Sequence, residues 1–406
     1  MFNRQNTSPA NNQNLLVIVI LAVTGSFGAL SIDALVPALP EIAREFQTTT
    51  LQTQWTISSF LLGFGLGQML IGPLADRFGR RPTLLWGIAL YTITSLCCIL
   101  VDSIELLTAM RFLQAVGAAA GAVITRAVVR DVYTSDKAAK ALSVMLSITL
   151  LTPFIAPIIG GLAVTYFHWT LSLWIMAACG TLCLLANGHH LVESLPPDQR
   201  HSLHILHIIS VYKDIIRSPV FLRHCLTYSF CFAGLFIYIA NAAFIIVNTM
   251  GYGPESVGYL FAGTSLGASL GAYLSRLLLN RNPVHIVQRL GILSFIIGCI
   301  CVLILALLET HNIYLFGFSM VFCTIGMGIS WPSCTSRAMA PFKKSAGSAS
   351  ALLGGLQFIL ASVTSLLAAR FIQQDFLIMA VAMMICAVMV VIVFYGLRPL
   401  ADDQAD

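Results

Sequence analysis

Two ionisable side chains, Asp33 and Arg111, stand inside long apolar runs of the sequence. A charged group at the centre of a bilayer costs about 2.5 to 3.5 kcal/mol on insertion scales, so something must offset this cost. At about 1.5 Å per residue, both lie roughly 9 Å from the outer ends of the helices that would carry them. Burial disfavours the charged form of a carboxyl group and a nearby cation favours it, so Asp33 has what a proton carrier requires. The alternative is a structural pair that holds two helices together.

A loop with the sequence GPLADRFGRRP, residues 72–82, follows the second apolar run. It indicates a helix end, a tight glycine turn and a restart led by proline, with one acid among three bases. The alternative is a basic loop of the kind that anchors many membrane proteins. In the fifth run, prolines and glycines cluster at Pro153, Pro157, Gly160 and Gly161. The alternative interpretation of this cluster is a kinked helix with ordinary packing, because proline and glycine are common in membrane helices.

The composition decides the class of protein, since 58% of the 406 residues are hydrophobic and only 10% are charged. Soluble domains carry about 25% charged residues, which excludes a large soluble enzyme. A bilayer crossing needs about 20 apolar residues. Runs of this kind lie at 15–39, 51–75, 82–101, 105–129, 141–166, 170–191, 220–248, 255–279, 284–307, 312–335, 345–370 and 375–397. Because backbone groups in lipid need internal partners, these runs predict twelve transmembrane helices.

The longest polar interruption, 192–219, divides the runs six and six. It predicts an N-terminal bundle at 1–191, a cytoplasmic linker with an amphipathic helix at 192–219, and a C-terminal bundle with a short cytoplasmic tail at 220–406. Most of the 22 Lys and Arg residues fall on the side of the N-terminus, which also accounts for the net charge of +5 without nucleic acid. The positive-inside rule then puts both termini in the cytoplasm. We expect a multi-pass protein of a bacterial inner membrane.

Three stretches are similar to motifs of the major facilitator superfamily: the 72–82 loop, residues 111–121 (RFLQAVGAAAG) and residues 153–161 (PFIAPIIGG). The third resembles the motif of its drug/proton antiporters. Residues 31–40 (SIDALVPALP) and 126–131 (RAVVRD) narrow the resemblance to the bicyclomycin-resistance-like (Bcr/CflA) efflux branch. The second half departs from it, with Ser275 at the position that matches Asp76. The resemblance implies an all-α integral membrane fold of two pseudo-symmetric six-helix bundles.

The resemblance also implies roles. Asp33 and Arg111 are expected to face one water-filled space between the bundles, with Gln114, one turn after Arg111, in support of them or of the substrate. In the implied antiport cycle, Asp33 is protonated from outside as substrate leaves and releases the proton inside as substrate binds. Gly25 stands where relatives with a wide substrate range sometimes have a second acid, so fewer groups can titrate here.

The opposite wall of the cavity is expected to come from polar and aromatic side chains of the second half. The candidates are Tyr228, Tyr238, Asn241, Trp331, Gln357 and Phe358. The alternative is that they face neighbouring helices or lipid.

A gate is expected at the cytoplasmic face and along the fifth helix. Its predicted residues are Gly72, Asp76, Arg77, Gly79, Arg80, Arg81, Arg130, Asp131, Pro153, Pro157, Gly160 and Gly161. We expect Asp76 to lie near the start of the eleventh helix, around Ser345, because exposed backbone N–H groups favour an anion. Arg80 should reach Asp131.

Neither a cofactor nor a metal is predicted. The eleven cysteines fall inside apolar runs and are interpreted as small hydrophobic residues. His201, His204 and His207 are spaced as metal ligands could be, but the apolar residues between them favour an amphipathic helix. The chain has no phosphate-binding loop or nucleophile elbow, so the proton gradient is the expected energy source.

The predicted function is proton-coupled export of small amphiphilic molecules or drugs by alternating access, with multidrug efflux and antibiotic resistance as its consequence. The predicted partners are a small-molecule substrate, protons and the lipid bilayer, and we expect a monomer rather than an enzyme or a nucleic-acid-binding protein. Three alternatives stay open: a dedicated exporter of one endogenous metabolite, such as an amino acid derivative or siderophore, a proton-coupled uptake symporter, and a non-transporting receptor.

Overall fold

The computed structural model describes residues 11–133, 135–200, 205–372 and 375–397. The first half contains α1 (Asn11–Gly25), α2 (Phe27–Asp33), η1 (Val36–Ala38), α3 (Leu39–Glu45), α4 (Thr50–Phe78), α5 (Arg80–Cys97), α6 (Ile104–Val132), α7 (Ser135–Tyr166) and α8 (Thr170–His190). A linker follows with η2 (Pro197–Gln199) and α9 (Ile205–Ile216). The second half contains α10 (Pro219–Phe244), η3 (Ile245–Thr249), α11 (Pro254–Leu279), α12 (Val284–Leu307), α13 (Ile313–Met339), η4 (Ala340–Ser345), α14 (Ala346–Ile372) and α15 (Phe376–Gly396).

The two bundles contain twelve helical rods if α1, α2, η1 and α3 are counted as one broken rod and α10 and η3 as another. The linker helix α9 is not included in this count. Within the described ranges, nine helices are long and apolar enough to cross a membrane, and the first rod, bent by 44° at Ser26, makes a tenth. The other two rods are α5, which begins with Arg80 and Arg81, and α11, which is rich in glycine and serine. The predicted all-α, twelve-helix fold is confirmed.

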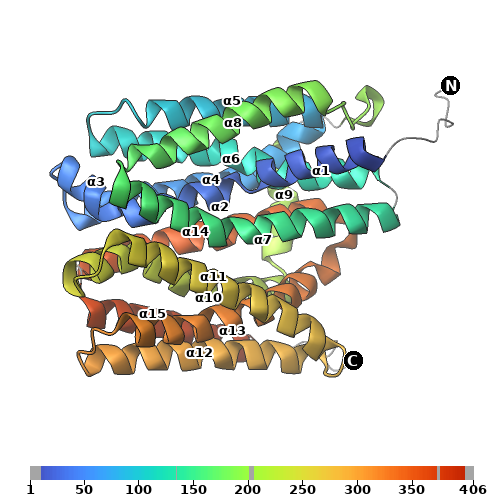
Figure 1. Ribbon diagram of the computed structural model, residues 1–406. Helices are drawn as coiled ribbons and strands as arrows, with labels where there is room; N and C mark the ends of the chain where they lie inside the picture. Colours follow the sequence, from blue (N-terminus) through green and yellow to red (C-terminus); the bar gives the residue numbers. More distant parts are fainter. Residues whose placement is uncertain (1–10, 134, 201–204, 373–374, 398–406) are drawn as a thin grey trace.

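The rods form two bundles, α1–α8 and α10–α15, that lie side by side with α7 and α11 facing each other (Figure 1). We call the end of the bundles at which α9 lies the linker end, and the opposite end, which carries the starts of α4, α8 and α11, the far end. α9 crosses between the bundles at the linker end (Figure 1). This arrangement brings residues from both halves together along one seam.

The first rod is not the single helix predicted for residues 15–39, because it breaks at Ser26 and again after Asp33. Pro37 has no N–H to donate to the carbonyl of Asp33, so the α-helical pattern cannot continue there. The N–H of Leu35 instead bonds the carbonyl of Ile32 at 3.2 Å, which leaves the carbonyl of Ser31 without its usual helical partner. Asp33 is thus the last residue of the short helix α2, directly before the turn at Ala34 and Leu35, and not part of one long helix.

The two bundles touch mainly through α4 against α14 and through α7 against α11. Gly65 and Gly355 let α4 and α14 approach closely, since a Cβ at Gly65 would lie 2.8 Å from the carbonyl oxygen of Gly355. Toward the linker end the contact continues to Met69, which packs on Gly355. At Gly72, one turn further, an added Cβ would meet none of the described atoms within 4 Å. The bundles therefore meet along the far half of the seam and part toward the linker end.

Candidate transport site between the bundles

Asp33 is the last residue of α2 and as a residue is only partly buried, although Ser31, Ile32 and Ala34 beside it are buried. In the described part of the chain, no hydrogen bond or ion pair reaches this carboxylate. An acid without a fixed partner at the depth of the bilayer is costly to keep charged. Asp33 is therefore an acid in the first rod whose carboxylate has no fixed partner among the described residues.

Arg111 is completely buried in the first bundle, so the prediction that it faces an open space beside Asp33 is wrong for this structure. Its Nη2 donates to the carbonyl of Ser31 at 2.8 Å and its Nη1 to Oε1 of Gln114 at 2.5 Å. The guanidinium also lies 4.3 Å from the ring centroid of Phe60. These dipoles and the ring face compensate the buried cation. Arg111 thus stabilises the backbone beside Asp33 through the carbonyl of Ser31. It does not form a hydrogen bond with the carboxylate of Asp33.

A polar network surrounds this guanidinium, and two of its members were not predicted. Gln114 donates from Nε2 to Oγ of Ser95 at 2.6 Å, in agreement with the supporting role expected of it. The hydroxyls of Ser31 and Tyr91 are 2.8 Å apart, and the ring of Tyr91 stacks on Phe27 at a centroid distance of 4.3 Å. Tyr91 and Ser95 are one turn apart in the third run, which is the signal that could have revealed them.

Aromatic rings from both bundles form a continuous contact, which we call the aromatic seam. It consists of Phe64 of α4, Tyr228, Phe232 and Phe236 of α10, Trp331 of α13 and Phe358 of α14. The two bundles meet where Phe64 and Phe358 pack edge to face, with centroids 4.8 Å apart. Within the seam, Trp331 of the second bundle is the most exposed of these rings, at 40%.

The structure brings the predicted Tyr228, Trp331 and Phe358 together in this seam, and it adds three phenylalanines. The i, i+4 spacing of residues 228, 232 and 236 is the sequence signal for those on α10. Tyr238 does not line the seam, because it packs in the core of the second bundle against Phe261, at a centroid distance of 5.1 Å. Gln357 is buried and 8% exposed.

Asn241 belongs to a set of hydrogen bonds that join the bundles in the far half of the seam. Nε2 of Gln54 donates to Oδ1 of Asn241 at 2.6 Å, between two buried side chains. The Oγ of Ser362 donates to the carbonyl of Ser58 at 2.6 Å. These partners lie 187 and 304 residues apart in the sequence, so no local pattern could have paired them. Asn241 is therefore a closing contact rather than part of an open cavity wall.

The proline and glycine cluster of α7 lies on this same interface. Pro157 has no N–H for the carbonyl of Pro153, and Oγ of Ser265 in α11 donates to that carbonyl at 2.7 Å. Gly160 faces the first rod and Gly161 faces α11: their added Cβ atoms would lie 2.1 Å from the carbonyl oxygen of Ala34 and 3.2 Å from Cα of Glu255. Pro153, Pro157 and Gly161 thus lie at the contact between the halves, whereas Gly160 packs against the first rod within its own bundle.

At the linker end, the 72–82 loop forms a charged cluster. Arg80 pairs with Asp76 at 2.6 Å and with Asp131 at 3.1 Å, so the predicted contact with Asp131 is present. The predicted contact of Asp76 with the start of α14 is not among the hydrogen bonds of the described residues, and its carboxylate instead pairs with Arg80 within its own bundle. The other basic residues stay local: Arg77 lies over Phe78, Arg81 donates to the carbonyl of Gly188, and Arg130 donates to that of Arg126.

Glu193 holds this loop in place, and the sequence analysis missed it. Its carboxylate accepts the backbone N–H groups of Arg80 at 2.9 Å and Arg81 at 3.3 Å, at the first turn of α5. An anion at a helix N-terminus is favoured by the helix dipole. Gly79, with φ of 103°, makes room for it, since a Cβ there would lie 2.4 Å from the carboxylate. The only signal in the sequence for this contact was the position of a glutamate directly after the sixth apolar run.

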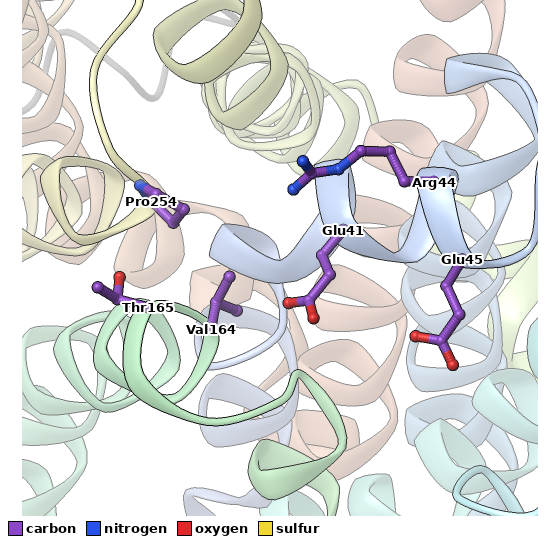
Figure 2. Close-up of a pocket in the computed structure, with 6 residues that line it drawn as sticks. All are labelled: Glu41, Arg44, Glu45, Val164, Thr165 and Pro254. Carbon is purple, nitrogen blue, oxygen red and sulfur yellow. The ribbon is translucent and has the colours of Figure 1, made fainter.

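A hollow at the far end lies between α3, α7 and the start of α11, and it is separate from Asp33. It is lined by Glu41, Arg44, Glu45, Val164, Thr165 and Pro254. Glu41 and Glu45 extend to one side of α3 while Arg44 extends to the other (Figure 2). Glu45 pairs with His168 at 3.1 Å, and Thr165 donates to Glu255 at 3.0 Å.

Among the described residues, no group of three His, Cys, Asp or Glu side chains could hold a metal ion. His201 and His204 lie outside the described residues, as does the side chain of His207. The cysteines of the described segments are free thiols.

Comparison with known proteins gives consistent matches along the whole chain. The family described as Major Facilitator Superfamily matches residues 21–365. The chain is 30% identical over 396 residues to the uncharacterized MFS-type transporter YdgK of Bacillus subtilis, covering 96% of this chain and 97% of the relative. It is 26% identical to a bicyclomycin resistance protein homolog of Haemophilus influenzae (94% and 95% covered) and 27% identical to multidrug resistance protein D of Escherichia coli (89% and 90% covered).

Solved structures share the fold at low sequence identity. A D-xylose-proton symporter superposes with a TM-score of 0.74 at 13% identity, covering 93% of this chain and 97% of the symporter. A bacterial homolog of the human lysosomal transporter Spinster, in an inward-facing conformation, superposes with a TM-score of 0.72 at 15% identity, covering 98% and 99%.

Proposed function

Because the chain belongs to the major facilitator superfamily, whose members are membrane transporters rather than enzymes, we propose that it is a proton-coupled antiporter that exports small amphiphilic molecules. Relatives named as multidrug and bicyclomycin resistance proteins support efflux over uptake. The single observation that carries proton coupling is Asp33, an acid in the broken first rod whose carboxylate has no described partner.

The proposed orientation puts the linker end in the cytoplasm, as the distribution of Lys and Arg residues favours. The described conformation, which is joined at the far half and parted at the linker end, then corresponds to access from the cytoplasm. In the cycle, cargo binds as Asp33 releases its proton inside, and Asp33 is protonated from outside as cargo leaves. Each proton that moves inward contributes about 2.3 kcal/mol per 100 mV, enough for more than tenfold accumulation.

The cargo is proposed to contact the aromatic seam. Ring faces and edges recognise other aromatic groups, and a large apolar wall with few fixed charges suits neutral or weakly charged amphiphiles. Arg111 presents no exposed donor to an anionic cargo in this conformation, because its side chain is completely buried and bonded inside the first bundle. This argues against the dedicated exporter of an anionic metabolite.

The test uses inverted membrane vesicles with an imposed pH gradient and a panel of dyes, amphenicols and amino acids. We expect uptake of several amphiphiles that collapses with an uncoupler. Asp33→Asn should reduce gradient-driven uptake at least tenfold, because an amide cannot carry a proton. Asp102→Asn, at an exposed loop residue, is the matched control and should transport normally.

Full gradient-driven pumping by Asp33→Asn would refute the proton role. Transport of one metabolite alone would replace the proposal by a dedicated exporter, and gradient-independent accumulation would remove proton coupling altogether.

A further inference from the structure

The linker helix α9 connects the two bundles along the chain, and it also contacts both of them. On one side it belongs to the second bundle: Ile215 is 1% exposed and packs in a cluster with Phe221 of α10 and Leu352 of α14. Val211, one turn before Ile215, borders the same cluster. This apolar contact attaches α9 to the second bundle.

On its other side, α9 is hydrogen-bonded to the first bundle. The hydroxyl of Tyr212 donates to the carbonyl of Met69 in α4 at 2.8 Å. That carbonyl is available because the residue four positions later is Pro73, which has no N–H to donate to it. The bond therefore replaces a helical hydrogen bond that α4 cannot make.

The place of this bond on α4 is the edge of the contact between the bundles. The side chain of Met69 packs on Gly355 of α14, whereas Gly72 has open space around it among the described atoms. α4 continues to Phe78, roughly 13 Å beyond Met69 at about 1.5 Å per residue. The bond between Tyr212 and Met69 thus lies where the bundles begin to part.

We propose that α9 is a strap that limits how far the linker ends of the two bundles separate, with the Tyr212 hydroxyl on the Met69 carbonyl as its catch. The strap is fixed to the second bundle by a buried apolar face. It is attached to the first bundle by the packing of Met69 at the border of that face and by one hydrogen bond that can break. This inference concerns the amplitude of opening and does not depend on the cargo or on proton coupling.

The catch holds at any physiological pH, because its donor does not ionise. Burial, and then the neighbouring carboxylate of Asp76, raise the pKa of Tyr212 to about 12. Asp76 in turn pairs with Arg80, so the catch lies beside the charged cluster of the 72–82 loop.

The experiment measures the separation of the linker ends in the full-length protein. Spin labels are attached through a ketone-bearing unnatural amino acid at Val132 and Arg281, two exposed positions at the linker ends of the first and second bundles, so that the eleven native cysteines stay in place. Distance distributions are recorded by double electron–electron resonance. Tyr212→Phe should raise the population of the wide state roughly two- to tenfold, the range for loss of one neutral hydrogen bond.

Two further variants make the result specific. Pro73→Ala supplies an N–H that can satisfy the Met69 carbonyl within α4, so it should widen the distribution as Tyr212→Phe does. Adding Tyr212→Phe to Pro73→Ala should then have little further effect. Tyr395→Phe, at an exposed tyrosine of α15, is the matched control and should leave the distribution unchanged.

Distributions of Tyr212→Phe that superimpose on the wild type would overturn the proposal. So would equal widening by Tyr395→Phe, or fully additive effects of Tyr212→Phe and Pro73→Ala. The strap is judged by the distances in the Tyr212 and Pro73 variants with Asp33 intact, and the antiport is judged by vesicle uptake in Asp33→Asn, so failure of the strap and failure of the proposed antiport are separable.

Discussion

The third and fourth rods of the two bundles share one framework but carry different chemistry. In the first bundle α5 and α6 touch at glycines, since a Cβ at Gly117 would lie 2.7 Å from the carbonyl oxygen of Gly87. In the second bundle α12 and α13 repeat this contact, where a Cβ at Gly326 would lie 2.5 Å from the carbonyl oxygen of Gly291. The close approach of these helices is therefore common to both halves.

The side chains beside the two glycine contacts differ. Aligned on these glycines, the first bundle has Tyr91, Ser95, Arg111 and Gln114, and the second has Phe295, Cys299, Met320 and Cys323. The set in the first bundle holds the hydrogen-bonded cation of Arg111. The set in the second bundle is apolar, and the thiols of Cys299 and Cys323 lie 3.9 Å apart in it. The comparison teaches that the close helix approach needs only the small residues, from which we predict that the buried charge of the first bundle serves function rather than packing.

The shared framework predicts the largest effect. Gly117→Ala and Gly326→Ala should each destabilise the protein by about 1 to 3 kcal/mol or more, because a methyl group would press on the backbone of the neighbouring helix. Thermal melting in detergent checks this. Gly263→Ala, where an added Cβ meets none of the described atoms within 4 Å, is the control and should melt as the wild type does. Two glycines with unequal sensitivity would break the proposed equivalence of the halves.

The difference between the halves predicts the next effect. Arg111→Met puts into the first bundle the residue type that the second carries at Met320, so the protein should still fold. Gradient-driven uptake should fall at least tenfold, because the turn that carries Asp33 loses its fastening to α6. Vesicle transport and the size-exclusion profile together check both parts. Unchanged transport would mean that transport does not require the cation of Arg111. A variant that does not fold would mean that the cation is needed for the structure.

The smallest effect is expected at the edge of the network. Tyr91→Phe matches Phe295 of the second bundle, keeps the stacking on Phe27 and removes only the hydrogen bond with Ser31. The loss of one neutral hydrogen bond is worth about 1 kcal/mol. Transport should therefore fall a few-fold, measured as the initial rate beside Tyr273→Phe, an exposed control. Complete loss of transport would show that Tyr91 takes part in proton movement directly.

Much of the fold could be predicted because lipid leaves the backbone few choices. Apolar runs long enough to cross the bilayer have to satisfy their own hydrogen bonds, and helices do this locally. The same reasoning found Asp33, since an acid in such a run stands out from its neighbours. The break at Pro37 was also present in the sequence, but its effect on the carbonyl of Ser31 became evident only in the structure.

The candidate site was less predictable, because its contacts join distant parts of the chain. Glu193 reaches the start of α5 across more than a hundred residues, and Gln54 reaches Asn241 across 187. A polar side chain in a transmembrane helix indicates that it needs a hydrogen-bond partner, but the sequence does not show which residue that partner is. The same limit explains why Tyr238 was placed in the cavity when it lies in the core of its bundle.

The amino-acid sequence by itself determined the class of protein, the helical runs and the positions of the buried ionisable groups, because these follow from composition and from the length of each run. Only the tertiary structure decided that Arg111 bonds a backbone carbonyl, that aromatic rings of both halves meet, and that α9 bridges the bundles. The physical reason is that burial in lipid acts on each segment alone, whereas a donor selects its acceptor by distance and direction after the helices have packed.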